Sequence, residues 1–480
     1  MRPFKKLLDS AAKLLCVALL LSTVGAGCTQ GPDAATAAAS KKVEINVWGV
    51  IDDEAAYDAI FKDYRALHPN VTINFRRFTL EEYEDQLLNA MAEDRGPDIF
   101  MIHNTWVGKY MPKILPMPLQ TKTALESIQG TLKKELVWTL VTQPTVSIRQ
   151  FKLDYPDAVL GDMLRTVNVS TNPDKKDMQT RVVGIPLSVD TLAMYANKDL
   201  LNAAGISTVP QNWDDFQTAV KKLVKLDDQG NILQAGAGLG LGSNVERASD
   251  IIIDLMMQNG AEMSTADGTP TFTQIPAKLQ GQRDVPPAEQ ALQFYTDFAN
   301  PSKDVYTWNA KMPNSLNAFI QGKSAFFFGY GYDLPAIRTG APQLNLGISQ
   351  MPQITGNPVV NYANYWAYTV SKKTKNPDIS WDLLNFMRKP EENKKFLDVA
   401  QRPAALRSQL NTQLDNEDIG VFASQVLTAQ SWYRGNDPAA MNSAFVQLIE
   451  DAQTTDPEKY MTIINVAAEK VAQTIPSGGI

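Results

Sequence analysis

The chain has 480 residues and a formal charge of −7, with 44% hydrophobic and 20% charged residues. This composition is ordinary for a globular protein, and the length favours two or more domains. An acidic chain without a basic block is poorly suited to phosphate backbones, which argues against nucleic-acid partners. The two cysteines are Cys16 and Cys28, near the N-terminus, so we expect no disulfide and no cysteine metal site in the folded body.

The N-terminus combines a basic start with a short apolar run. Arg2, Lys5 and Lys6 precede the apolar residues Leu14 to Leu21. This run is shorter than the ~20 residues that a membrane span needs, so it predicts a secretory signal peptide over residues 1–27. Residues 1–27 carry four basic and one acidic side chain, and their removal leaves a charge of −10.

Small residues directly before Cys28 resemble the bacterial lipobox. The resemblance implies that Cys28 is alkylated by a lipid and becomes the mature N-terminus. The alternative is a cleaved leader with an incidental cysteine. Residues 28–40 are poor in large apolar side chains and predict a flexible tether, which would hold the body at the outer face of the cell membrane.

The first part of the body alternates between strand and helix patterns. The predicted elements are, in order, a strand over Val43–Val47, a helix over Ala55–Leu67, a strand over Val71–Phe75, a helix over Glu81–Met91 and a strand over Ile99–Ile102. This order predicts an open, mostly parallel α/β sheet. Ligands of such sheets bind beyond the carboxyl ends of the strands, so the candidate site loops are Trp48–Asp53 and His103–Trp106.

The rest of the chain is less regular. Residues Leu140 to Thr180 carry scattered prolines and are predicted to be an inserted surface excursion, and Ser264 to Pro287 lacks a regular pattern. Further predicted elements are a strand around Leu192–Met194, helices over Asn197–Ala204 and Trp213–Leu226, strands over Ala325–Phe328, Leu346–Ile348 and Tyr365–Val370, and helices at Trp381–Met387 and Ile463–Val471.

Several motifs favour ordinary structural roles. Gly322-Lys323-Ser324 lacks the earlier glycine of a phosphate-binding loop and fits a turn before a strand. The alternating glycines from Gly236 to Gly242 fit a flexible strand end or a site wall without side chains. His103 at a strand end could contact ligand or simply pack. Asp52, Asp53 or Asp190 could supply the two carboxylates of a glycosidase, so that class stays open.

A resemblance emerges in the middle of the chain. The segments Gly184–Ile206, which reads GIPLSVDTLAMYANKDLLNAAGI, and Val209–Phe216, which reads VPQNWDDF, look like the maltose-binding-protein-like family 1 extracellular solute-binding proteins of ABC importers. Three further segments occur along the chain in the same order as in that family: Gly96–Ile99, Ala318–Ala325 and Trp366–Asn376. The similarity runs from about Lys41 to the C-terminal helix, apart from Leu140–Thr180.

The resemblance implies a periplasmic-binding-protein-like α/β fold, in which two lobes are joined by hinge strands and close on a solute. Lobe 1 would comprise residues 41–188 and 366–408, and lobe 2 residues 189–365 and 409–480. The crossings are expected near 186–191, 362–368 and 402–412. The protein would be a monomer without cofactor, metal or catalytic residues, delivering a sugar or another small polar solute to permease subunits.

The resemblance also implies which residues touch the solute. Asp190 would accept hydrogen bonds from sugar hydroxyls, and Tyr332 would stack on a sugar ring. Asn104 and Trp106 follow the third strand. The remaining expected contacts are Trp48, Trp308, Trp366 and Phe445. Two other classes stay open: a surface carbohydrate-active enzyme, and a surface sensor or adhesin without a permease.

Overall fold

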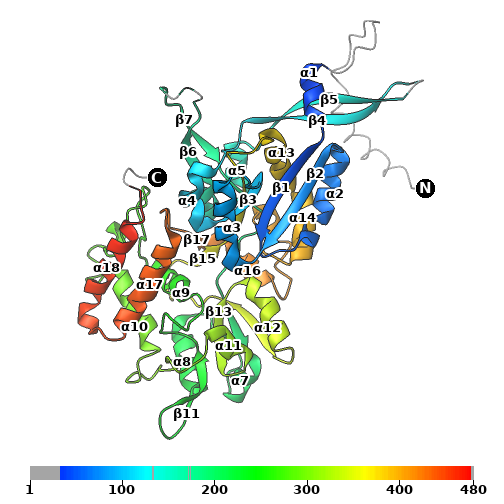
Figure 1. Cartoon of the computed structure of the whole chain (residues 1–480). Coiled ribbons are helices and arrows are strands. Elements are labelled where there is room, and N and C mark those ends of the chain that lie inside the picture. The colour runs from blue at the N-terminus through cyan, green and yellow to red at the C-terminus, as the bar shows by residue number, and fades with distance from the viewer. Residues whose placement is uncertain (1–32, 132–133, 171, 173, 477–480) are drawn as a thin grey trace, which may run out of the picture.

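The computed structural model of the protein describes residues 33–131, 134–170, 172 and 174–476 (Figure 1). The predicted signal peptide and the predicted lipid site Cys28 lie outside the described residues. Within the described ranges, none of the helices has the length and apolar character that a membrane span requires.

Lobe 1 contains a five-stranded sheet in the order β2-β1-β3-β16-β8. Its strands are β1 (Val43–Val50), β2 (Val71–Phe78), β3 (Ile99–His103), β8 (Ile185–Pro186) and β16 (Trp366–Val370). β1 runs parallel to β2 and β3, whereas β16 is antiparallel to both of its neighbours. Flanking helices include α2 (Asp58–Leu67), α3 (Leu80–Ala92), α13 (Pro377–Met387) and α14 (Pro390–Ala400). The strand–helix alternation predicted for residues 43–102 is confirmed.

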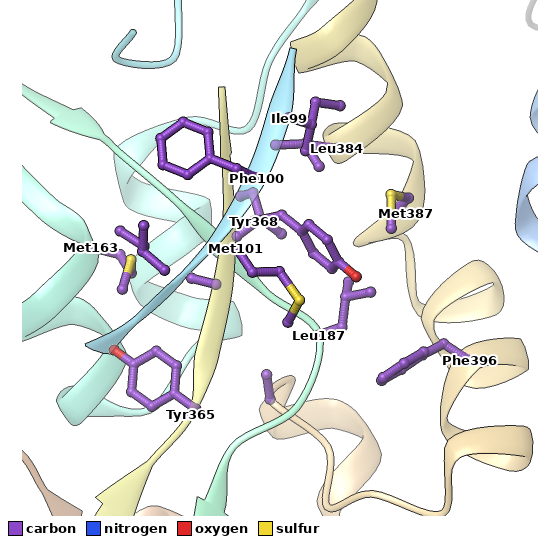
Figure 2. Close-up of a cluster of buried hydrophobic side chains, with 14 of the residues drawn as sticks. Ile99, Phe100, Met101, Met163, Leu187, Tyr365, Tyr368, Leu384, Met387 and Phe396 are labelled. Atoms are coloured by element: carbon purple, nitrogen blue, oxygen red, sulfur yellow. The ribbon is translucent and has the colours of Figure 1, made fainter. Parts of the chain in front are cut away.

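The core of lobe 1 is built on the two faces of β3 and β16. Figure 2 shows these strands side by side, with Leu384 and Met387 of α13 on one side and Met163 on the other. Ile99 and Phe100 are fully buried. This double coverage explains why β3 is a continuous apolar run rather than an alternating one.

Lobe 2 contains a second five-stranded sheet, in the order β11-β12-β13-β10-β14. Its strands are β10 (Ala193–Asn197), β11 (Lys225–Leu226), β12 (Ile232–Ala237), β13 (Ser324–Gly329) and β14 (Leu346–Gln350). The helices include α7 (Lys198–Ala203), α8 (Trp213–Leu223), α9 (Ala248–Gln258), α10 (Pro287–Asp297), α11 (Ser315–Ile320), α12 (Leu334–Gly340), α17 (Pro438–Ala452) and α18 (Tyr460–Ala472). The expected fold class, two lobes each built on a helix-flanked open sheet, is confirmed. The expected mostly parallel pairing is not found in lobe 2, where β10 is antiparallel to β13 and β14 and only β12 and β13 run parallel.

A small three-stranded sheet joins the lobes, in the order β17-β15-β9. It contains β9 (Asp190–Thr191), β15 (Asn361–Asn364) and β17 (Ala429–Gln430). The buried side chains change from one core to the other at these strands, and the first two crossings lie where the sequence suggested. The third was expected near 402–412, and beyond Leu410 the chain alternates between the lobes. Phe422 packs with Tyr195 and Phe327 of lobe 2, Ala423 to Ala429 return to the lobe 1 core, and Trp432 joins the main lobe 2 core. The helix α15 (Arg407–Leu410) contacts α14 of lobe 1, whereas α16 (Gly420–Gln425) contacts β14 of lobe 2 and the hinge strand β9.

The region expected as a surface excursion is only partly one. Two hairpins project from lobe 1: β4 (Gln120–Gln129) with β5 (Glu135–Pro144), and β6 (Leu164–Asn168) with β7 (Met178–Val182). Between them lie α5 (Ile148–Asp154) and α6 (Asp157–Met163). Phe151, Val159 and Met163 of these helices are fully buried in the lobe 1 core, so this part of the segment is core rather than surface.

The expected tether is also partly ordered. Residues Ala34–Ala39 form the helix α1, whose first turn is capped by the side chain of Asp33. An aspartate cap followed by alanines favours a helix. The amide of Asn70 donates hydrogen bonds to the carbonyls of Ala39 and Lys41, which fixes the end of α1 to lobe 1.

Strand β3 has a gap in its hydrogen bonding that a side chain fills. β1 pairs with β3 only at Ile99 and Phe100. The buried hydroxyl of Tyr83 donates to the Met101 carbonyl at 2.7 Å, and the Met101 N–H donates to the same hydroxyl at 2.9 Å. Tyr83 therefore replaces a strand neighbour just before the chain reaches His103.

We expect Tyr83→Phe to lower the free energy of unfolding by about 1–3 kcal/mol, because it leaves both buried Met101 groups without a partner. Urea unfolding measures this change. The matched control is Tyr306→Phe, which removes a half-buried hydroxyl that accepts only from the nearby Asn309 amide. Equal losses in the two variants would contradict this role for Tyr83.

Candidate ligand-binding site

A pocket of about 390 Å³ lies between the two lobes at the hinge. Its lining comes from lobe 1 (Ile51, Leu80, Glu81, His103, Trp106 and Trp366), from lobe 2 (Arg247 and Tyr332) and from the hinge strand β15 (Asn364). The two aromatic residues expected from opposite lobes, Trp106 and Tyr332, therefore share one cavity. The segments after β1 and β3 contribute as their positions at the carboxyl ends of parallel strands predict.

A larger cavity of about 720 Å³ lies at the β17 edge of the hinge. It is lined mainly by the loop that follows α9 and by Gln430–Trp432 and Arg434. Its one aromatic residue, Trp432, is only 6% exposed, and none of its lining residues comes from the loops after β1 and β3. We therefore place the candidate site in the smaller pocket.

The lobe 1 wall is aromatic. Trp106 ends the short 3₁₀ helix Asn104–Trp106, and its ring meets Trp366 edge to face with centroids 5.1 Å apart. Trp366 is the first residue of β16 and pairs with His103, the last residue of β3. The strand register therefore sets the two indoles beside each other. Tyr83 and Tyr110 support Trp106 with stacked rings 6.4 and 5.6 Å away.

His103 is a neutral connector between lobe 1 and the hinge. Its Nδ1 accepts from the Thr105 N–H, so the proton lies on Nε2, which donates to Oδ1 of Asn364 at 3.2 Å. Burial lowers the pKa of His103 to about 4, and the imidazole is therefore uncharged at neutral pH. Its contact with Asn364 orients an amide that lines the pocket.

The lobe 2 wall is formed by Tyr332 and Arg247. The Tyr332 ring stacks on Tyr330, and the Arg247 guanidinium lies 5.4 Å from the Tyr332 ring centroid. Arg247 has a left-handed backbone, with φ of 58°, at the start of α9. Its Nε and the Tyr332 hydroxyl are buried and have no hydrogen-bond partner among the described residues. Such groups are available to a polar ligand.

Two carboxyl groups lie behind this wall. Asp250 accepts from the Tyr330 hydroxyl at 2.9 Å, and Asp333 accepts from the Tyr330 N–H at 2.8 Å. Burial raises the pKa of Asp333 to about 7, against the opposing effects of the Tyr330 N–H and of Arg247. The Arg247 charge thus offsets part of the cost of burying acids in this lobe.

Asp190 is placed differently from the expectation. Its carboxylate accepts from the Thr191 N–H at 2.9 Å and lies beside the backbone N–H groups of Gly331 and Tyr332, which act to lower its pKa. It is 8% exposed and does not line the pocket, and burial raises its pKa to about 6. Asp190 therefore holds the loop that carries Tyr332.

The remaining expected residues divide into two groups. Trp48 packs on Phe78 at 4.6 Å, and Asn104 is buried at the start of the 3₁₀ helix that ends at Trp106, so neither lines the pocket itself. Trp308 and Phe445 are wrong as contact residues, because both are fully buried in the lobe 2 core. The Trp308 indole donates to Asn244, and Phe445 packs against Phe272 and Trp432.

Sequence reasoning missed several lining residues. Arg247 and Glu81 are ordinary charged residues at helix starts, and no sequence pattern marks them as cleft residues. Ile51 lies in a predicted site loop and has φ of 70°, which is a strained conformation for a β-branched side chain. The alternating glycines are not a site wall. A Cβ on Gly238 would lie 2.5 Å from the Cβ of Ser315, so the absence of a side chain permits close packing there.

Comparison with known proteins agrees with this architecture. A galactooligosaccharide-binding protein of Bacillus subtilis is 20% identical over 435 residues, covering 88% of this chain and 86% of the relative. The solved cyclic alpha-maltosyl-1,6-maltose binding protein of Arthrobacter globiformis matches with a TM-score of 0.64 and 18% identity, over 90% of this chain and 99% of that one. The GacH receptor of Streptomyces glaucescens matches with a TM-score of 0.63 and 17% identity, over 90% and 99% of the two chains.

The structural matches establish the fold, and a match to a sequence family model establishes the protein family. The family model described as bacterial extracellular solute-binding protein matches residues 48–394, which is most of the chain. With two lobes, a hinge sheet and a pocket between them, the chain belongs to the bacterial extracellular solute-binding proteins.

Proposed function

We propose that this solute-binding protein captures a carbohydrate in the interlobe pocket and presents it to the permease of an ABC importer. The observation that carries the proposal is the composition of the two walls, with Trp106 and Trp366 on one lobe facing Tyr332 and Arg247 on the other. Binding would favour the closed arrangement of the lobes by its higher affinity for that state.

The chemistry of the pocket suits a sugar. Pyranose rings present apolar C–H faces that pack on aromatic rings, and their hydroxyls need donors and acceptors. Glu81 and Asn364 supply acceptors, and the Arg247 guanidinium supplies donors. The carbohydrate ligands named for the relatives support the same class.

The placement of the carboxylates supports binding without hydrolysis. A glycosidase needs two carboxyl groups on either side of the scissile bond. Of the residues that line the pocket, Glu81 alone carries a carboxylate. Asp190 faces backbone N–H groups, and Asp52 accepts from the Arg402 guanidinium at 3.1 Å.

We further propose that the chain acts as a monomer at the outer face of the cell membrane, attached through a lipid on Cys28. Membership of an extracellular family supports the location. The basic and apolar leader and the small residues before Cys28 support the attachment. ABC permease subunits would be its protein partners.

A thermal-shift screen of sugars, amino acids, polyamines and metal ions tests the solute class, and we expect a rise in melting temperature with one class of sugar. Tyr332→Ala and Trp106→Ala should each weaken binding of that sugar at least tenfold in calorimetric titration, because each removes a stacking face. Tyr306→Ala, outside the pocket, is the control. Unchanged affinity in both pocket variants, or a shift with a cation alone, would contradict the proposal.

Asp190→Asn should weaken sugar binding several-fold without creating or removing a catalytic activity. An amide has one acceptor oxygen where the carboxylate has two, so the loop that carries Tyr332 is held less firmly. The wild-type protein should return the sugar unchanged after prolonged incubation, as chromatography would show. Products that form with wild type and disappear with Asp190→Asn would identify an enzyme instead.

The titration of Asp333 should make the free energy of unfolding fall as the pH rises. Its pKa is about 7 in the folded protein and about 4 in the unfolded chain, so the folded state holds an extra proton between these values. Raising the pH from 5 to 7 should therefore cost wild type about 2 kcal/mol more than Asp333→Asn, which cannot titrate. Urea unfolding at both pH values measures the difference, and parallel losses would argue against it.

A further inference from the structure

The outer end of lobe 1 carries an apolar surface that the interlobe pocket does not use. Ile128 and Leu136 are a cross-strand pair near the tip of the β4–β5 hairpin, and they are 69% and 61% exposed. Figure 1 shows this hairpin and α1 together at the end of lobe 1 farthest from lobe 2. Paired strands that project as a lone hairpin have no core of their own to bury such side chains.

The two faces of the hairpin have different surroundings. The Thr121 hydroxyl donates to Asp382 of α13, and Thr121 and Thr123 are buried against lobe 1. Side chains alternate along a strand, so Ala124 and Ile128 lie on the opposite, outer face. Helix α1 contacts both strands, and Ala124 is 1% exposed. The outer face is thus covered near α1 and open at Ile128 and Leu136.

The docked helix brings this face close to the proposed lipid. The chain enters α1 at Asp33, so Cys28–Pro32 are the residues between the proposed lipid site and the helix. Five residues span at most about 17 Å, whereas ten-residue strands such as β4 and β5 extend about 33 Å. A chain tethered this closely keeps α1 and the outer face of the hairpin near the bilayer surface.

The side chains around the pair suit a bilayer interface. Trp138 lies on the same face, paired with Glu126, and is half-buried. Tryptophan is favoured where an apolar region meets water and headgroups. Lys41, Lys42, Lys122 and Lys134 are exposed at this end of an otherwise acidic chain. Glu126 and Glu135 offset part of that positive charge. The apolar pair Ile128 and Leu136 is therefore the main source of attraction to the bilayer.

We propose that the outer face of the β4–β5 hairpin, with Ile128 and Leu136, rests in the headgroup region of the membrane and orients the tethered protein. The proposal rests on the proposed attachment through Cys28. A short tether raises the local concentration of the hairpin at the surface to the millimolar range, so a contact too weak to hold the free protein is occupied. Lobe 1 then faces the membrane, and lobe 2 extends away from it.

The test uses residues 29–480 with an N-terminal histidine tag, captured on phosphatidylcholine–phosphatidylglycerol vesicles that contain a nickel-chelating lipid. This chain has no cysteine, so Ile128→Cys accepts a single environment-sensitive fluorophore. The matched control is Leu233→Cys, which is 62% exposed on β12 in lobe 2. We expect at least a twofold rise in emission, with quenching by nitroxide-labelled lipid, at position 128 and no change at 233.

A second pair of variants separates insertion from mere proximity. With the fluorophore at Lys134→Cys, the added changes Ile128→Ser and Leu136→Ser should abolish the emission change while the melting temperature stays constant. Equal signals at 128 and 233, an unaffected serine variant, or a signal that forms in solution without vesicles would each overturn the proposal. The solution signal would indicate a second copy of the chain as the occupant.

The tag replaces the lipid, so this result is independent of the modification of Cys28. Mass spectrometry of the N-terminal peptide, from the full chain expressed in a lipoprotein-processing bacterium, tests the modification itself.

Discussion

The pocket depends on one segment of chain, Asn361–Val370, which serves the hinge and lobe 1 in turn. As β15 it pairs Asn364 with Asp190, and as β16 it pairs Trp366 with His103. These two pairings fix the hinge strand relative to the end of β3. A shift of one residue would turn every side chain of the segment to the opposite face of its sheet, so the indole of Trp366 would leave Trp106.

The two lobes support the pocket by different means. On lobe 1 the wall is a packed aromatic stack, and His103 is neutral and fully occupied by hydrogen bonds. On lobe 2 the wall contains Arg247 with a left-handed backbone and polar atoms that lack a hydrogen-bond partner within the described part of the chain. Unmet hydrogen-bonding capacity and a strained backbone are both costs that a bound ligand can reduce. Ile51 shows the same kind of strain on the lobe 1 side.

The sequence predicted the structure well where the local hydrophobic pattern matches the burial of the residues in the folded protein. Residues 43–102 have clear periods, so their strands, helices and site loops could be predicted, and Trp106 followed from its place after β3. Trp308 and Phe445 could not be separated from contact residues, because an aromatic side chain looks the same in a core and in a cleft. Arg247 lies in the pocket only because α9 begins beside the hinge, which no local pattern encodes. The third crossing could be located only roughly, because the short, irregular helices between 404 and 429 follow no clear period and pack on both lobes.

The third crossing also constrains how the lobes can move. Asp162 of α6 is fully buried; it pairs with Arg434 and accepts from the hydroxyls of Tyr365 and Ser431, both at 2.7 Å. Breaking a buried ion pair is costly, because it leaves a charge without a partner. A Cβ on Gly108 would lie 2.5 Å from the Gly435 carbonyl, so lobe 1 touches this segment closely. The segment after β17 is thus fixed to lobe 1, although the side chain of Trp432 belongs to the lobe 2 core. A rotation of lobe 2 about this point would preserve the buried pair while changing the separation of Trp106 and Tyr332, whereas sliding one lobe across the other would break it. The buried pair therefore favours a hinge motion about the β17 edge over a sliding motion as the route by which the two lobes would close.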